Sequence, residues 1–245
     1  MVRIEDILYP LDWKYSVLNH IYDEIFIDNI YEKCYDVKDD DIIVDLGSNI
    51  GLFSLYVLEK ADIDKIYMVE PLLQNFDYMI RNMIYNKKDD LHKCVFIKAG
   101  ISEDGYTTIE DGDIGSKLGL GHEITKTFSF MSFVEYYNLD KIDVLKIDIE
   151  GSEILMFNDD AFNWIFNNNV DRIMGEMHPY GKNGEKIFNI LNRLVNGGYK
   201  IQLFSVDGYD ITDNIMKNNT LSGGLKSWDF YQQFLYYAEK RQLIK

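Results

Sequence analysis

The residues best suited to chemistry lie in Lys146–Glu153, which reads KIDIEGSE at the end of a short apolar run. Alternate residues of an extended chain point to the same side, so Lys146, Asp148 and Glu150 are expected to share one face. Three charges on one face of a buried strand are costly unless they form ion pairs or belong to a functional site. An ion pair between Lys146 and one acid would meet that requirement without catalysis. The position at the end of the run favours a functional site.

A glutamate and a histidine show the same spacing in the segment GEMHP, where Glu176 and His178 also share a side. If the two runs are neighbouring strands, both residues converge with Asp148. A lone histidine is usually structural, but one beside a carboxylate can act as a general base. His178 is the preferred base, because an ordinary imidazole pKa of about 6.5 permits proton uptake at neutral pH, whereas Lys146 favours the charged form of Asp148. Asp148 is the second candidate, and Glu150 and Glu176 are expected to orient the base or the substrate.

A glycine turn follows an earlier apolar run, in the segment VDLGSNIG (Val44–Gly51). A strand, a tight turn and a helix start in this order bring a ligand close to backbone amides. The segment lacks the dinucleotide pattern GxGxxG, because Asn49 replaces the glycine that lets pyrophosphate approach. Asp45 repels phosphate and suits an ammonium group. An ordinary strand–helix turn capped by Ser48 or Asn49 is the alternative without a ligand.

An acidic residue ends the next apolar run, where Glu70 precedes Pro71 and follows Asp45 by 25 residues. A carboxylate about 20 residues beyond such a turn typically accepts hydrogen bonds from ribose hydroxyls. The turn and Glu70 together predict a nucleoside ligand with a cationic part and no diphosphate. S-adenosylmethionine fits both features, and NAD fits less well.

Alternating strands and helices must position these residues. Seven apolar runs predict strands, although the last could equally be helical, and long amphipathic segments between them predict helices. Such an order predicts an α/β fold with a mostly parallel sheet that is covered on both faces, and ligands at the carboxyl ends of its strands. The predicted strands are Asp41–Leu46, Lys65–Val69, Cys94–Ile97, Asp143–Ile149, Asp171–Met177, Tyr199–Ser205 and Phe234–Ala238. The predicted helices are Ile50–Lys60, Leu72–Asn86, Ser152–Asn168 and Glu185–Val195, with Phe133–Tyr137 as a further helical segment.

The chain is predicted to form one domain, residues 1–245. Residues 1–40 are expected to be a helical extension, residues 41–206 a cofactor-binding core, and residues 207–245 a strand or helix that completes the sheet. Residues 101–131 are expected to form small strands and a loop.

Three of these segments resemble the signature blocks of the FkbM family: Val44–Ser54 (VDLGSNIGLFS), Val69–Pro71 (VEP) and Val144–Glu153 (VLKIDIEGSE). The resemblance covers roughly Asp41–Tyr180. Members are class I S-adenosylmethionine-dependent methyltransferases. The resemblance therefore implies a Rossmann-like sheet of seven strands with the seventh antiparallel. It also implies O-methylation of a hydroxyl on a sugar, a glycan or a secondary metabolite.

The resemblance also assigns residues to the cofactor. Its glycine loop and ribose carboxylate have direct matches in this chain. The adenine segment matches less well, because Lys98 stands where the family has Asn and Gly100 where it has an aliphatic residue, so contacts there are expected to use the backbone. The predicted cofactor-binding residues are Asp45, Gly47, Ser48, Asn49, Gly51, Glu70, Pro71, Lys98, Ala99, Gly100 and Asp148.

Asp148, Glu176 and His178 would also suit a divalent metal, and two carboxylates with a histidine fit Mn²⁺ better than Mg²⁺. The resemblance does not require a metal, and such trios are common by chance. The sequence therefore predicts no metal and an activity that survives EDTA, with the trio as the alternative.

Two other function classes stay open: a protein that binds S-adenosylmethionine without catalysis, and an NAD-dependent or nucleotide-sugar enzyme on a similar fold. Intact Asp148, Glu176 and His178 argue against the first, and Asn49 argues against the second. The acceptor is expected to bind residues 1–40 and 101–131, which resemble no signature. Neither its identity nor the oligomeric state can be predicted from the sequence.

The composition excludes some classes of partner. The 245 residues carry a formal charge of −16, which disfavours binding to the phosphate backbone of nucleic acids and to anionic membranes. No apolar run reaches the roughly 18 residues that a membrane helix needs, and the charged N-terminus has no signal-peptide pattern. Cys34 and Cys94 belong to no metal or redox motif, which predicts reduced thiols and a cytoplasmic protein.

Overall fold

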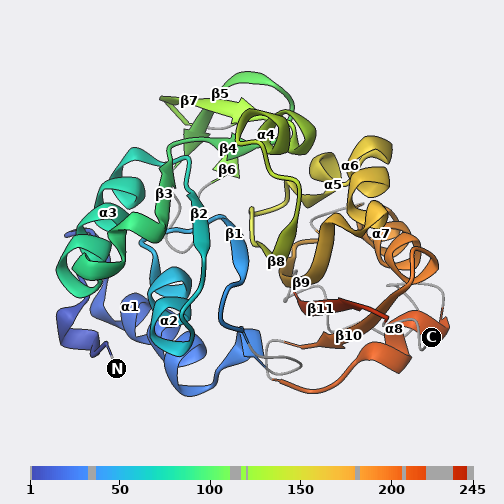
Figure 1. Ribbon diagram of the computed structural model, residues 1–245, viewed down its shortest axis with the longest axis horizontal. Coiled ribbons are helices and arrows are strands. Elements are labelled where there is room, and N and C mark those ends of the chain that lie inside the picture. The colour runs from blue at the N-terminus through green and yellow to red at the C-terminus, as the bar shows by residue number, and fades with distance from the viewer. Residues whose placement is uncertain are drawn as a thin grey trace.

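The computed structural model describes residues 2–32, 37–110, 117–119, 121–179, 183–205, 208–218 and 234–241. Its central sheet pairs seven strands in the order β10-β11-β9-β8-β1-β2-β3 (Figure 1). The strands are β1 (Ile42–Leu46), β2 (Lys65–Val69), β3 (Cys94–Ile97), β8 (Ile142–Ile147), β9 (Val170–Met177), β10 (Tyr199–Phe204) and β11 (Phe234–Lys240).

The strand order places the segments with chemistry at one edge of the sheet. β1 pairs in parallel with β2 on one side and with β8 on the other, so Leu46 lies opposite both Val69 and Ile147. β9 continues the parallel series, with Gly175 opposite Ile147. The carboxyl ends of four strands therefore meet where the strand order reverses, which is where α/β sheets bind ligands.

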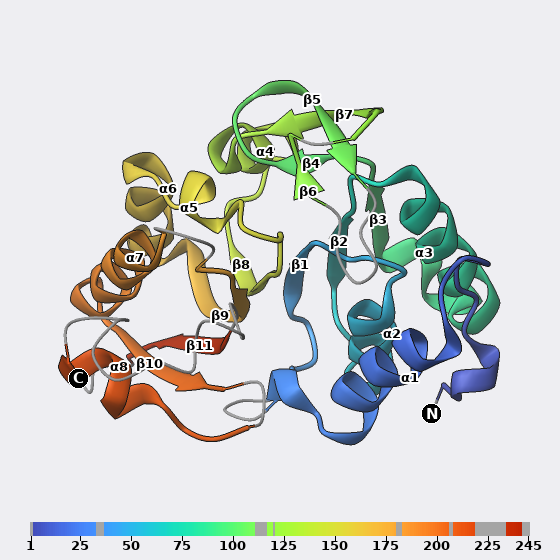
Figure 2. The same cartoon turned by 180° about the vertical axis from the view of Figure 1, so that it is seen from behind.

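Helices cover both faces of this sheet (Figures 1 and 2). Ile43 and Met68 pack into the hydrophobic cluster that contains helices α1 to α3, whereas Val44 and Leu145 pack into the cluster with α4, α6 and α7. This alternation along the strands confirms the predicted α/β fold. The helices are α1 (Tyr15–Tyr22), α2 (Leu52–Lys60), α3 (Leu73–Asn86), α4 (Phe130–Tyr136), α6 (Asp159–Trp164) and α7 (Gly184–Asn196).

The last run of the chain is a strand, not a helix. β11 is antiparallel to both β9 and β10, with Tyr237 opposite Met174 and Gln202. Its first five residues are all buried. A strand between two others can bury both of its faces, which explains why FLYYA is apolar throughout. The antiparallel seventh strand that the resemblance implies is therefore confirmed.

The prediction of a single helix over Ser152–Asn168 is wrong. The chain forms a short helix α5 (Glu153–Met156), breaks, and resumes in α6 and a π-helical turn (Ile165–Asn169). Asn158 marks the break, because its side chain accepts a hydrogen bond from the Ala161 amide at 2.9 Å and so caps α6.

Residues 100–128 build a second, smaller sheet in the order β4-β7-β5-β6. Its strands are β4 (Gly100–Ile101), β5 (Gly105–Glu110), β6 (Lys117–Leu118) and β7 (Glu123–Phe128). Leu118 packs directly on Gly100, where an added Cβ would lie 2.9 Å from Leu118 Cδ1. The small strands expected here are present, and β6 packs on Gly100, shortly after the end of β3.

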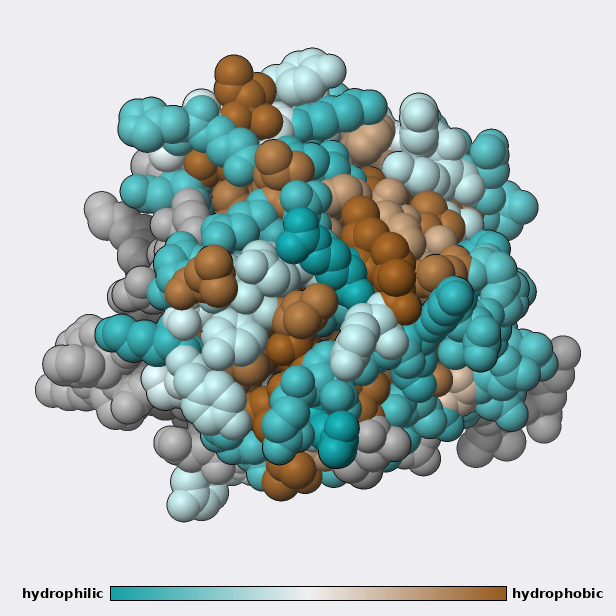
Figure 3. All heavy atoms as spheres, turned by 90° about the vertical axis from the view of Figure 1, so that its left-hand side faces the viewer, coloured by the Kyte–Doolittle hydropathy of each residue, from teal (hydrophilic) through white to brown (hydrophobic). Residues whose placement is uncertain are grey.

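The N-terminal residues wrap the face that carries α2 and α3. They contain turns of 3-10 helix (Ile4–Asp6 and Ile30–Glu32), α1 and a π-helical turn (Asp23–Ile27). Helices outside this region include a 3-10 turn (Lys88–Lys93) and α8 (Thr212–Asn218). The surface in Figure 3 shows hydrophobic residues in short patches separated by hydrophilic ones.

Among the described residues no helix has the length and apolarity to cross a bilayer. Cys94 is a free thiol, and Cys34 lies outside the described residues. The division at residues 40 and 206 stays a prediction.

Candidate active site

The turn after β1 depends on residues with positive φ. Gly47 (φ +81°), Asn49 (+51°) and Gly51 (+88°) all adopt left-handed backbone, which costs glycine nothing and asparagine little. The amides of Gly47 and Ser48 donate to the Val69 carbonyl at 3.0 and 2.9 Å. A Cβ on Gly47 would lie 1.8 Å from the Asp148 carbonyl oxygen. Glycine is therefore required here so that the ends of β1 and β8 can touch.

Glu70 organises the same turn from the end of β2. Its two carboxylate oxygens accept hydrogen bonds from the amides of Asn49 and Leu72, each at 2.9 Å. The side chain is buried, and burial raises the pKa of Glu70 to about 7, although the two amides act in the opposite direction. Glu70 thus titrates close to neutrality beside the turn.

Asp45 and Lys146 form a buried pair beneath the turn. Asp45 Oδ2 accepts from Ser54 Oγ at 2.7 Å, and Asp45 Oδ1 lies 3.2 Å from Lys146 Nζ at ion-pair distance, without hydrogen-bond alignment. Lys146 Nζ donates to the Gly47 carbonyl at 2.7 Å. Burial lowers the pKa of Lys146, but Asp45 and Asp148 outweigh it and the net shift is upward. This pair fixes the turn from inside the fold.

A pocket of about 570 Å³, part of it open to solvent, lies at the ends of β1 and β2. Predicted residues that line it are Gly47, Asn49, Glu70, Pro71, Ala99, Gly100, Asp148 and Glu150. The other predicted cofactor residues, Asp45, Ser48, Gly51 and Lys98, are not among its lining residues, and Lys98 forms an ion pair with Glu123 at 2.9 Å.

Five lining residues were not predicted: Val69, Asn75, Ile101, Leu118 and Ile149. Asn75 adds a polar amide to the pocket, and Leu118 adds apolar surface. Asn75 is a polar residue on the buried side of α3, and that position was a usable signal. Leu118 comes from the small sheet, and no motif marks it. The oxygens Oδ1 of Asn49 and Asn75 are buried and have no hydrogen-bond partner within the described part of the chain.

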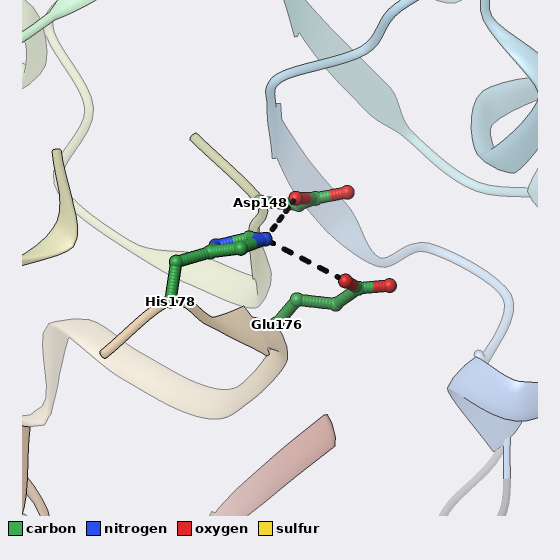
Figure 4. A group of neighbouring side chains, drawn as sticks. All are labelled: Asp148, Glu176 and His178. Atoms are coloured by element: carbon green, nitrogen blue, oxygen red, sulfur yellow. Dashed lines mark ion pairs between the residues drawn. The ribbon is translucent and has the colours of Figure 1, made fainter. Parts of the chain in front are cut away.

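Next to the pocket, carboxylates from two strand ends converge on His178 (Figure 4). His178 Nε2 lies 3.7 Å from Glu176 Oε2, 3.8 Å from Glu150 Oε2 and 4.0 Å from Asp148 Oδ1. The other ring nitrogen, Nδ1, is 2.8 Å from Glu153 Oε1. The four residues predicted to be catalytic therefore meet, and Glu153 is an addition from the last position of the KIDIEGSE segment.

This crowding changes the protonation of the histidine. Burial lowers the pKa of His178. The hydrogen bond to Glu153 and the charges of Glu153, Asp148 and Glu150 outweigh burial and raise this pKa to about 10. Burial, then the charge of Asp148, raises the pKa of Glu176 to about 8, while His178 acts in the opposite direction. His178 thus holds its proton at neutral pH, which removes the reason for preferring it as the base.

The N-terminal residues border this cluster. Lys146 Nζ lies 5.9 Å from the centre of the buried Tyr31 ring. Burial raises the pKa of Glu24, and the charge of Asp148 adds to that rise, so Glu24 lies within electrostatic reach of the cluster. Tyr31 and Glu24 thus bring the N-terminal residues near the strand ends that form the site.

Known proteins resemble this chain over most of the region just described. A family model, the methyltransferase FkbM domain, matches residues 45–201. Methyltransferase 1 of Beauveria bassiana (strain ARSEF 2860) is 31% identical over 162 residues, covering 55% of this chain and 64% of that protein. Methyltransferase sdnD of Sordaria araneosa is 29% identical over 177 residues, covering 55% and 65%. The matches thus span less than two thirds of these relatives.

A solved structure supports the fold. The crystal structure of methyltransferase FkbM from Methylobacillus flagellatus KT has a TM-score of 0.57 with this chain at 16% identity, and the match covers 96% of this chain and 56% of that one.

Proposed function

Because the chain belongs to the FkbM methyltransferase family, we propose that it transfers the methyl group of S-adenosylmethionine to a hydroxyl of a small molecule or glycan. The observation that carries this proposal is that Asp148 and Glu150 line the pocket and also face His178 in the cluster beside it. A pocket for the cofactor and a set of proton-accepting groups therefore share a boundary.

The pocket residues fit this cofactor. Its ribose hydroxyls, adenine amino group and ammonium group are donors. The pocket offers acceptors: the Glu70 carboxylate, and the oxygens of Asn49 and Asn75, which have no partner among the described residues. Ile101 and Leu118 supply apolar surface for a flat base. When bound, S-adenosylmethionine supplies an electrophilic methyl group on a positively charged sulfur.

The cluster is suited to handle the acceptor proton. A neutral hydroxyl is a weak nucleophile, so a group that takes its proton speeds the transfer. Asp148 is the better placed base, because it lines the pocket, whereas His178 is buried and its Nδ1 is held by Glu153. His178 then positions the carboxylates of Asp148, Glu150 and Glu176 around it.

The test is methyl transfer itself. The full chain would be incubated with methyl-labelled S-adenosylmethionine and a panel of sugars, glycans and hydroxylated metabolites. We expect label in an ether product and equal formation of S-adenosylhomocysteine with at least one hydroxyl acceptor. Transfer to nitrogen or carbon acceptors alone would contradict O-methylation.

Replacing Glu70 with alanine should weaken S-adenosylhomocysteine binding by about 1–3 kcal/mol, or roughly 5- to 150-fold, because hydrogen bonds to a charged acceptor are lost. Calorimetry measures the affinity. Glu103→Gln removes an exposed carboxylate from the turn between β4 and β5 and serves as the control. An unchanged affinity in the Glu70 variant would remove the ribose assignment.

The affinity for S-adenosylhomocysteine should also depend on pH through Glu70. Burial raises the pKa of Glu70 to about 7, so the group is mostly neutral at pH 6 and mostly a carboxylate at pH 8. Ligand hydroxyls bind the carboxylate, so the affinity should rise about tenfold between these values. In Glu70→Gln the affinity should stay flat over the same range. A wild-type affinity that falls as the pH rises would contradict the assignment.

A further inference from the structure

We propose that Asp148, Glu176 and His178 form a binding site for a divalent cation, with Mn²⁺ as its best match (Figure 4). Each residue offers one ligand atom, and the three atoms lie within 4.8 Å of one another. The proposal deepens the function proposed above and shares its site. The sequence pattern favoured a site without metal, and this proposal adopts its alternative, a metal held by these three residues.

The distances between the ligand atoms suit a shared ion. His178 Nε2 is 3.7 Å from Glu176 Oε2 and 4.0 Å from Asp148 Oδ1, both too long for hydrogen bonds. Nitrogen and oxygen ligands bind such ions at about 2.0–2.2 Å, so two ligands of one ion can lie up to about 4.4 Å apart. Small side-chain shifts would bring all three atoms into coordination.

A second observation is the way the histidine is held. Its Nδ1 lies 2.8 Å from Oε1 of Glu153, a residue with no exposed surface, whose other oxygen has no hydrogen-bond partner among the described residues. That contact turns Nε2 toward Asp148 and Glu176. Histidines that bind metals almost always have their other nitrogen fixed by a carboxylate or carbonyl. The ring is therefore oriented in advance for a ligand on Nε2, and an ion bound there would displace the proton from that nitrogen.

The charges and donor types select the ion. Asp148, Glu150 and Glu176 approach one point from two strand ends, and a divalent cation would offset their repulsion. The donor set has no thiolate, which disfavours soft metals, and its histidine disfavours Mg²⁺ and Ca²⁺. An ion here would adjoin the pocket through Asp148 and would acidify a hydroxyl that binds to it, and this effect would take the place of Asp148 as the base.

The experiment measures Mn²⁺ binding to the EDTA-treated full chain by electron paramagnetic resonance, with no cofactor or acceptor present. We expect one saturable site. Asp148→Asn and Glu176→Gln should each weaken binding at least about tenfold, and Glu153→Gln should weaken it about 10- to 100-fold through the histidine. Glu103→Gln, which removes an exposed carboxylate, should bind as the wild type does. Melting temperatures without Mn²⁺ show that each variant is folded.

Two results would overturn the proposal. One is no saturable Mn²⁺ binding by the folded wild type. The other is equal affinity in Asp148→Asn and Glu103→Gln, which would mean adventitious binding to an acidic surface. Binding of S-adenosylhomocysteine, measured on the same samples, separates this proposal from the function. If the chain binds S-adenosylhomocysteine but not Mn²⁺, the ion site is rejected and the cofactor pocket stands. If it binds Mn²⁺ but not S-adenosylhomocysteine, the cofactor pocket is rejected and the ion site stands.

Discussion

His178→Ala is expected to lower methyl-transfer turnover by about 10²- to 10⁴-fold, the usual loss when a group that handles the proton is disabled. The imidazole faces Asp148, Glu150 and Glu176, so its removal leaves those carboxylates without the group that positions them. The affinity for S-adenosylhomocysteine should change little, because His178 does not line the pocket. Turnover and affinity should be measured on the same preparation.

Stability must be followed in this variant, because His178→Ala also leaves Glu153 as an uncompensated buried charge, at a cost of about 3–5 kcal/mol. His178→Asn provides a milder change whose amide can still donate to Glu153. His92→Ala removes an exposed imidazole and serves as the matched control. Near-normal turnover in folded His178→Asn and His178→Ala would show that the histidine is only structural and that aligning the reactants suffices.

Gly47→Ala is expected to abolish measurable cofactor binding and to destabilise the fold. Its Cβ would lie 1.8 Å from the Asp148 carbonyl oxygen, at a φ of +81°. Backbone strain of this kind costs about 1–3 kcal/mol, and forced overpacking about 1–3 kcal/mol more. Relief requires the turn to move away from β8, which displaces Asn49 and Asp148 from the pocket together.

Gly198→Ala is the matched control for the glycine variant. Gly198 has a similar φ of +95°, but a Cβ there would meet no atom of the described residues within 4 Å. Gly198→Ala therefore has the cost of a positive φ without a steric clash. The residue follows α7, away from the turn after β1. Chemical denaturation and calorimetry on both variants separate the two effects. Equal losses of stability and intact cofactor binding in both variants would show that the contact between the turn and β8 is dispensable.

The parts of the site that could be predicted are those in which local sequence determines local geometry. Glycine and asparagine at 47, 49 and 51 allow positive φ, and the alternation in Lys146–Glu150 follows from the strand period. Parallel pairing then brings the ends of β1, β2, β8 and β9 to one edge. These features need no knowledge of side-chain packing.

The rest depends on contacts between segments that are distant in sequence. Glu153 reaches His178 across 25 residues, and Leu118 reaches Gly100 from the small sheet. The break at Asn158 depends on one side-chain cap within a segment of unbroken helical period. The shift in the pKa of His178 is the sum of burial and several carboxylates, and spacing alone cannot supply that sum.

The central claim is that the turn after β1 and Glu70 form a pocket for S-adenosylmethionine, and calorimetric titration tests it most directly. Titration of S-adenosylmethionine into the full chain should show saturable one-to-one binding that weakens in Glu70→Ala, and NAD should show none. Saturable binding of NAD without binding of S-adenosylmethionine, or equal S-adenosylmethionine affinity in wild type and Glu70→Ala, would contradict it.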